Sequence, residues 1–138
     1  MELYFLPENA VEAMHLSTLA DFGGLSGVRD EAALQASLAR PRHRRHYNPD
    51  ADVFEIAACY AFAFTRNHPY IDGNKRIAFH CAHAFLYLNG WILRAPQPEV
   101  VFQVLALAEG QLSEIDFAAW LRRRSVPQDQ DSPPVEPT

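Results

Sequence analysis

The chain has 138 residues, enough for one domain with a hydrophobic core, and 49% of them are hydrophobic, as in soluble globular proteins. The formal net charge of −5 argues against a general nucleic-acid-binding protein, and we expect no direct nucleic-acid binding. No apolar run is long enough to span a membrane, and the first residues lack the pattern of a signal peptide. The expected location is therefore the cytoplasm, without membrane attachment.

Two amphipathic helices are predicted in the first third of the chain. Residues 7–20 place apolar side chains at helical spacing before a pair of glycines. A second, shorter helix is expected from about Asp30, a candidate N-cap, to Arg40, and Pro41 is expected to end it. Residues 40–49 are rich in arginine and histidine and are predicted to form a basic loop or hairpin. A solvated loop is the usual interpretation of such a cluster, and a partner-binding edge is the alternative.

Two further helices are predicted to form the centre of the fold. Residues 53–64 are apolar nearly all round, which is typical of a buried helix. A second apolar-faced helix begins near residue 73 and stops before Gly90. Cys59 and Cys81 lie in these apolar patterns and are expected to be buried free thiols.

The last part of the chain predicts a short extended link at residues 91–93 and helices at residues 99–108 and 114–124. We find no convincing strand. From residue 127 onward the composition predicts a disordered tail rich in Pro, Asp and Gln, at residues 127–138. The expected fold is thus all-α, a single domain over residues 1–126, built around two central helices with the functional motif in the loop between them.

That loop and the first turn of the next helix read His-Pro-Tyr-Ile-Asp-Gly-Asn-Lys-Arg, residues 68–76, which we call the motif segment. Lys75, the only lysine of the chain, and Arg76 fall in the first helical turn. A helix N-terminus carries a partial positive charge and favours anions, so two cations there indicate that an anion binds from outside. A phosphate group is the usual anion at such a site.

His68 precedes a proline in a loop, where a neutral imidazole can take a proton from a hydroxyl. The alternative is an imidazole that only hydrogen-bonds to the loop, and the neighbouring polar motif residues favour the catalytic role. Asp72 also has two interpretations, a ligand of Mg²⁺ or the N-cap of the following helix. A phosphate at the site favours Mg²⁺.

The other motif residues are interpreted as phosphate-binding groups. Gly73 lets the backbone approach a ligand closely, and Asn74 can donate from its side chain and its backbone. Lys75 and Arg76 can neutralise charge on transferring phosphoryl oxygens. The alternative for such a pair is two solvated surface cations.

The motif segment resembles the signature of the Fic/Doc (Fido) family, His-x-Phe-x-(Asp/Glu/Pro)-(Gly/Ala)-Asn-(Gly/Lys)-Arg, in its Doc (death-on-curing) form, with Tyr70 in place of Phe. The resemblance covers about residues 1–125. It implies a Fic/Doc helical bundle, ATP as a substrate, Mg²⁺ as cofactor with Asp72 as its ligand, and catalysis by His68, Lys75 and Arg76. It also implies a set of nucleotide- and phosphate-binding residues: Gly73, Asn74, Lys75, Arg76 and Arg66.

Two positions distinguish the Doc subgroup from adenylylating Fic enzymes, which carry Gly at the position of Lys75 and a second Arg at that of Phe79. In Doc toxins this pattern goes with an inverted nucleotide whose γ-phosphate faces the catalytic His. The resemblance therefore implies a toxin that phosphorylates a protein hydroxyl, with elongation factor Tu as the known type of target, and so arrests translation. The alternatives are a protein adenylyltransferase, which transfers AMP, and a catalytically idle Fido-fold binding protein.

No internal inhibitor is expected in this chain. Self-inhibited Fic enzymes carry (Ser/Thr)-x-x-x-Glu-(Gly/Asn), and Leu105 stands where the hydroxyl should precede Glu109 and Gly110. The resemblance implies instead an antitoxin, a separate protein whose C-terminal segment folds into a groove over the active site.

Overall fold

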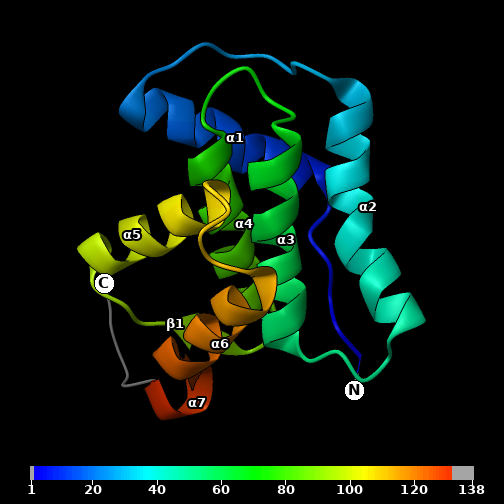
Figure 1. The fold of residues 1–138 in the computed structure, drawn as a ribbon, viewed down its shortest axis with the longest axis vertical. Helices are drawn as coiled ribbons and strands as arrows, with labels where there is room; N and C mark the ends of the chain where they lie inside the picture. The colour runs from blue at the N-terminus through cyan, green and yellow to red at the C-terminus, as the bar shows by residue number, and fades with distance from the viewer. Residues whose placement is uncertain (1, 132–138) are drawn as a thin grey trace.

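The structure is a computed structural model, and it describes residues 2–131. The fold is all-α, as predicted, with a small sheet near its C-terminal end (Figure 1). In chain order the elements are α1 (Glu8–Phe22), α2 (Glu31–Tyr47), α3 (Val53–Asn67), α4 (Asn74–Leu88), β1 (Trp91–Leu93), α5 (Gln97–Ala108), α6 (Glu114–Arg124), β2 (Ser125–Pro127) and α7 (Gln128–Asp131).

The central helices α3 and α4 pack against each other, as the sequence predicted, and the remaining helices surround them (Figure 1). α3 is buried over most of its length because it is apolar on nearly every face. It begins with a complete capping box: the Asp52 carboxylate accepts from the Glu55 N–H, and the Glu55 carboxylate accepts from the Asp52 N–H, both at 2.8 Å. The loop that joins α3 to α4 lies at the top of Figure 1, beside the loop that joins α1 to α2.

The prediction that Pro41 ends the second helix was wrong, and so was the predicted basic loop. α2 continues through Pro41 to Tyr47. A proline inside a helix removes one hydrogen bond and costs about 3 kcal/mol or more. Contacts on either side of the proline help to stabilise the helix: Glu114 of α6 accepts from Arg40 at 2.8 Å and from Arg44 at 3.2 Å.

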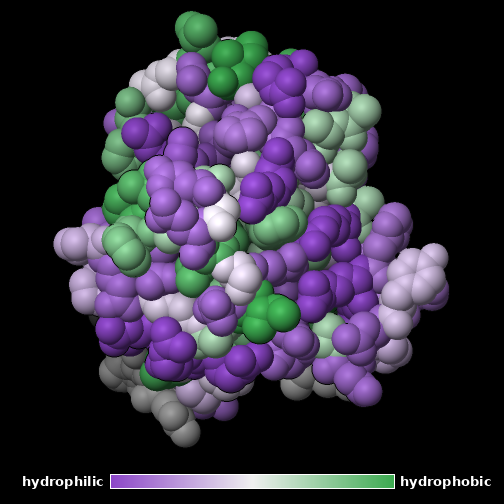
Figure 2. Space-filling model, viewed as in Figure 1, coloured by the Kyte–Doolittle hydropathy of each residue, from purple (hydrophilic) through white to green (hydrophobic). Residues whose placement is uncertain are grey.

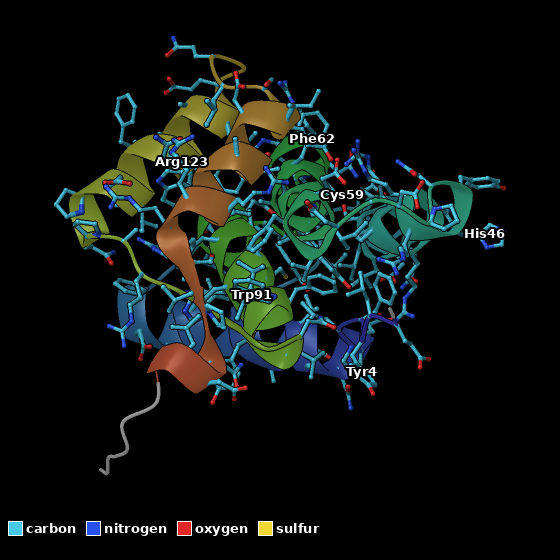
Figure 3. All side chains as sticks on the ribbon, turned by 90° about the horizontal axis from the view of Figure 1, so that it is seen from below. Tyr4, His46, Cys59, Phe62, Trp91 and Arg123 are labelled. Atoms are coloured by element: carbon cyan, nitrogen blue, oxygen red, sulfur yellow. The ribbon has the colours of Figure 1, made fainter. Side chains whose placement is uncertain are left out.

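Arg40 and Arg44 of the basic stretch thus join α2 to α6. Arg42 also lies over the Phe5 ring, with 5.0 Å between the guanidinium carbon and the ring centroid. Only the outer end of α2 projects away from the bundle, where Figure 3 shows His46 at the edge of the molecule.

The expectation of no strands was also wrong. β1 pairs antiparallel with β2, with Trp91 opposite Pro127 and Leu93 opposite Ser125. Strands of three residues are too short to show a periodicity in the sequence. The predicted disordered tail consequently starts too early, because Pro127 lies in β2 and the next four residues form α7. The rest of that tail, residues 132–138, lies outside the described residues.

Cys59 and Cys81 are buried free thiols, as predicted. Burial raises the pKa of the Cys59 thiol to about 12, so this sulfur stays protonated near neutral pH. Within residues 2–131, no helix combines the length and apolar character needed to cross a membrane.

Candidate active site

The motif segment is held against the α1–α2 loop, residues 23–30, by main-chain hydrogen bonds. Val28 and Tyr70 form an antiparallel bridge. The Pro69 carbonyl accepts from the Arg29 N–H at 2.7 Å, and the Ile71 N–H donates to the Gly27 carbonyl at 3.1 Å. Two loops that are 40 residues apart in the sequence thus form one surface, and Figure 2 shows hydrophobic side chains gathered over it at the top of the view.

His68, the predicted base, ends α3 in the left-handed region, with φ 46° and ψ 57°. It is the only non-glycine residue with positive φ among residues 2–131. Such a backbone costs about 1–3 kcal/mol and persists where the surroundings enforce it. Here Arg29 does so, because its Nε donates to the His68 carbonyl at 2.6 Å and its Nη2 to the Asn67 carbonyl at 2.8 Å. The backbone of His68 is fixed by these bonds, and its side chain is exposed.

Asp72 does not cap α4, so the N-cap interpretation was wrong. The N-cap is Gly73, and no side chain accepts a hydrogen bond there. The half-buried Asp72 carboxylate instead accepts from the Leu25 N–H through Oδ2 at 2.8 Å. Gly24 packs beside it, and a side chain there would bring a Cβ within 3.2 Å of the Asp72 Cβ.

The donor set fits a magnesium ion that is shared with a substrate phosphate. Asp72 offers a second carboxylate oxygen, and no group of three or more metal-binding side chains occurs within residues 2–131. Mg²⁺ commonly takes one or two carboxylates and completes its shell with water and substrate phosphates. A single carboxylate beside a phosphate site suits that mode of binding.

The Asn74 side chain does not point to a ligand, as its predicted role would require. Its side chain is buried and hydrogen-bonded within the motif segment: Oδ1 accepts from the Tyr70 N–H at 3.0 Å and Nδ2 donates to the Tyr70 carbonyl at 2.9 Å. The side chain therefore shapes the loop. What it leaves for a ligand is its backbone N–H.

The first turn of α4 carries both predicted cations. Lys75 and Arg76 are exposed, and the Arg76 guanidinium lies over the Phe22 ring at 4.5 Å from the centroid. Gly73 is left-handed, with φ 82° and ψ 16°, and helical Asn74 follows it. A left-handed residue followed by a right-handed one turns successive N–H groups toward one point, which is a common anion-binding arrangement.

Arg66, predicted to contact nucleotide or target, lies on the α5–α6 side of α3. Its guanidinium carbon is 5.1 Å from the centroid of the Phe62 ring, which Arg40 also covers at 4.8 Å. A Cβ at Gly110 would lie 3.4 Å from its Nη2. Figure 3 labels Phe62, the ring that both guanidinium groups cover.

Comparison with known proteins gives the same family as the motif. The model of the Fic/DOC family matches residues 5–86. The chain belongs to the Fic/DOC family. It is 34% identical over 117 residues to "Protein kinase doc" of Escherichia phage P1, covering 85% of this chain and 91% of that protein. It is also 42% identical over 76 residues to "Toxin Doc" of Mycolicibacterium smegmatis, covering 54% of this chain and 58% of that protein.

In this Fic/DOC domain, several residues that shape the motif segment were missed by sequence reasoning. Arg29 and the Leu25 N–H come from the α1–α2 loop, and His15 comes from α1, where its imidazole Nε2 is 2.7 Å from the Asp72 carbonyl oxygen. The available signal was a polar His15 on the core-facing side of an amphipathic helix.

Beside the motif helix, the Fic/DOC domain has a cavity of about 280 Å³ between α4, β1 and α5. Phe79, His80 and His83 line its α4 side. Burial lowers the pKa of both imidazoles below the ordinary value of 6.5, and the charge of Arg76 and the neighbouring His83 lower that of His80 further. Both rings are therefore neutral near pH 7.

Proposed function

We propose that this chain is a Doc-type toxin that transfers the γ-phosphate of ATP to a hydroxyl of a protein target of the elongation factor Tu type and so arrests translation. The observation that carries the proposal is the motif segment itself. One short loop presents an exposed imidazole at His68, a carboxylate at Asp72 and a cationic helix N-terminus at Lys75 and Arg76. The names of two relatives, a protein kinase and a toxin, support the same reaction class and biological role.

In the proposed reaction, the target hydroxyl oxygen attacks the γ-phosphorus of ATP. The bond from that phosphorus to the β–γ bridging oxygen breaks, and ADP leaves with the electron pair. His68 accepts the hydroxyl proton on a neutral ring nitrogen. Lys75, Arg76 and the N–H groups at the start of α4 offset the negative charge of the transferring group.

Magnesium is the proposed cofactor, and Asp72 would hold it through the carboxylate oxygen that does not accept from Leu25. When bound, the ion would neutralise phosphate charge and orient the phosphate chain. The protein contributes the fixed position of the carboxylate. The Leu25 N–H and the close approach of Gly24 both hold Asp72 in place.

Two side chains favour transfer of phosphate over transfer of AMP. Lys75 occupies the position at which a glycine would leave room for a nucleotide bound in the adenylylating pose. Phe79 is half-buried and lies against His80 and His83, with 5.7 and 5.8 Å between ring centroids. An apolar ring at this position offers no bidentate donor to a distal phosphate.

A second partner is proposed beside the target. As in a toxin–antitoxin system, a separate antitoxin would cover the active site with its C-terminal segment. A target of the elongation factor Tu type is cytoplasmic, and we propose the same location for this chain.

The proposal is tested by incubating the purified protein with bacterial lysate, Mg²⁺ and ATP labelled at either the α- or the γ-phosphate. We expect a labelled protein from γ-labelled ATP and none from α-labelled ATP, and no labelling by a His68→Asn protein. Transfer of the α-label would instead make the chain a protein adenylyltransferase. Absence of both labels, with the target protein added at high concentration, would favour a catalytically idle binding protein.

A further inference from the structure

His15 is a polar residue at a buried position of the fold. It lies on the core-facing side of α1 and is only 2% exposed. Its ring is stacked on the Tyr70 ring, with 3.6 Å between centroids and 12° between planes. Its Nε2 lies 2.7 Å from the carbonyl oxygen of Asp72, which is 57 residues away in the sequence. Both contacts are with the motif segment.

The partner of Nε2 determines where its proton is. A carbonyl oxygen only accepts hydrogen bonds, so the Nε2 of His15 must carry a hydrogen and donate it. This donation fixes the orientation of the peptide group that joins Asp72 to Gly73. Because the described chain has no cis peptide bond, the C=O and N–H of that planar group point in opposite directions. With the carbonyl held toward α1, the Gly73 N–H must point away from α1.

The Gly73 N–H is the first of the three N–H groups that the left-handed turn at Gly73 directs toward one point, the others being those of Asn74 and Lys75. None of these three groups donates a hydrogen bond within residues 2–131. If the peptide turned over, the Asp72 carbonyl oxygen would face the anion in place of the N–H. A donor would then become a repulsive acceptor at the site.

We propose that His15 is a positioning residue for phosphate binding, which holds the Asp72–Gly73 peptide with its N–H directed at the phosphate. This inference rests on the proposed function, because it assigns a role to His15 in binding the phosphates of that reaction. His15 does not touch the substrate. It acts through the peptide group, and the stacked Tyr70 ring keeps the imidazole in the orientation that the hydrogen bond requires.

The competing explanation is that His15 only fills space and satisfies its own polar atom. Two substitutions separate the contribution of the hydrogen-bond donor from that of the stacked ring. His15→Phe keeps a flat ring that can stack on Tyr70 but removes the donor. His15→Gln keeps an amide donor and removes the ring. Val11→Ala is the matched control, because Val11 is fully buried on the same helix and has no contact with the motif segment among its described hydrogen bonds.

The experiment measures binding of Mg²⁺–ATP and of inorganic pyrophosphate by calorimetry, and follows the backbone amide signals of Gly73 and Lys75 by NMR. We expect His15→Phe to bind both ligands about tenfold more weakly. This is the loss expected when the Gly73 N–H no longer donates a hydrogen bond to the charged phosphate. The ligand-induced shift of the Gly73 amide should shrink in the same variant. His15→Gln should recover part of the affinity, and Val11→Ala should bind like the wild type although it melts at a lower temperature.

The outcomes separate this inference from the proposed function. If the wild type binds ATP and His15→Phe binds it equally well with an unchanged Gly73 shift, the inference is overturned while the proposed function stands. If the wild type binds neither ligand, the proposed function fails and the inference fails with it. If His15→Phe does not fold, the ligand affinities of His15→Gln and Val11→Ala are compared instead. Equal loss of affinity in both variants would overturn the inference and leave His15 with a role in core packing only.

Discussion

The Asn74 side chain closes a ring on the backbone of Tyr70, accepting from its N–H at 3.0 Å and donating to its carbonyl at 2.9 Å. This pair of bonds draws the start of α4 back onto the motif loop. A second asparagine makes the same arrangement at the other end of α4, where Asn89 accepts from the Tyr4 N–H at 2.8 Å and donates to the Tyr4 carbonyl at 2.9 Å. Asn74 is buried and lies in the motif segment, whereas Asn89 is half-buried and far from it in the sequence, so Asn89 serves as a control for the loss of such a pair of bonds.

Asn74→Ala should lower both the stability and the activity of the protein. The Tyr70 backbone groups would lose their partner in a buried site, which costs about 1–3 kcal/mol of unfolding free energy. Asn89→Ala should lower stability without lowering ATP binding or γ-phosphate transfer. Urea denaturation and calorimetry provide the two measurements. If Asn74→Ala bound ATP normally, its side chain would be a stability element with no influence on the phosphate site.

His68→Asn should abolish transfer while keeping the fold. Asparagine tolerates the left-handed backbone that His68 adopts, so the hydrogen bond from Arg29 to its carbonyl should persist. Loss of a general base typically lowers a rate about 10²–10⁴-fold. Single-turnover transfer of γ-label measures the rate, and calorimetry should show nearly unchanged ATP affinity. Transfer at more than about a tenth of the wild-type rate is inconsistent with a base of that strength at His68.

Asp72→Asn separates the metal role from the structural one. The amide oxygen of asparagine can still accept from the Leu25 N–H, so the loop contact and the stability should be kept. The negative charge is lost, and an amide is a poorer ligand for Mg²⁺ than a carboxylate. We expect the Mg²⁺ concentration needed for half-maximal transfer to rise strongly. Asp72→Ala should lose stability as well, because the Leu25 N–H then loses its acceptor in the motif segment. Full activity of the Asn variant would contradict the metal role.

The main helices and the motif segment could be predicted from the sequence, because both are encoded locally, whereas the two short strands could not. Apolar periodicity marks α3 and α4, and the charge of Lys75 and Arg76 marks a candidate anion site at a helix start. The prediction that Pro41 ends the helix failed because distant residues also contribute there. The helix around it makes contacts with Glu114 on α6, which is 74 residues from Arg40 in the sequence.

The residues that hold the motif segment could not be predicted for the same reason. Leu25, Arg29 and His15 bond to atoms of the motif segment that are 47, 39 and 57 residues away, so no local spacing connects them to the site. Two of these bonds also end on carbonyl oxygens, and a carbonyl carries no side-chain identity that a sequence pattern could reveal. The side chain of Asn74 was assigned to the ligand because its type suits a phosphate, whereas its burial commits it to Tyr70.

The double variant Lys75→Gly with Phe79→Arg tests which phosphate is transferred. The glycine opens space at the start of α4, and the arginine adds a bidentate donor for a distal phosphate. Transfer of γ-label should fall, because the cation beside the transferring group is removed. Some α-label should then appear on protein. The two single variants serve as controls, since each changes only one feature. A double variant that phosphorylates like the wild type would show that neither position controls nucleotide orientation.

Acid should destabilise the protein through the two histidines of the cavity beside α4. Burial lowers the pKa of His80 and His83 in the folded chain below their ordinary value of 6.5. Below that pH the unfolded chain takes up protons more readily than the folded chain, so their contribution to stability is complete above about pH 6.5 and is lost as the pH falls. Carboxylates also destabilise proteins in acid, so the comparison must be with a variant.

His83→Gln should lose less unfolding free energy than the wild type between about pH 7 and pH 5, because one of the two protonation sites is gone. It should also raise the pKa of His80, since His83 is one of the causes that lower it. Urea denaturation at several pH values measures the first effect, and NMR titration of the His80 ring measures the second. The burial of His80 and the charge of Arg76 remain in the variant, so its pKa should move only part of the way back to 6.5. Equal pH dependence of the two proteins would mean that His83 is protonated as easily in the folded chain as in the unfolded one.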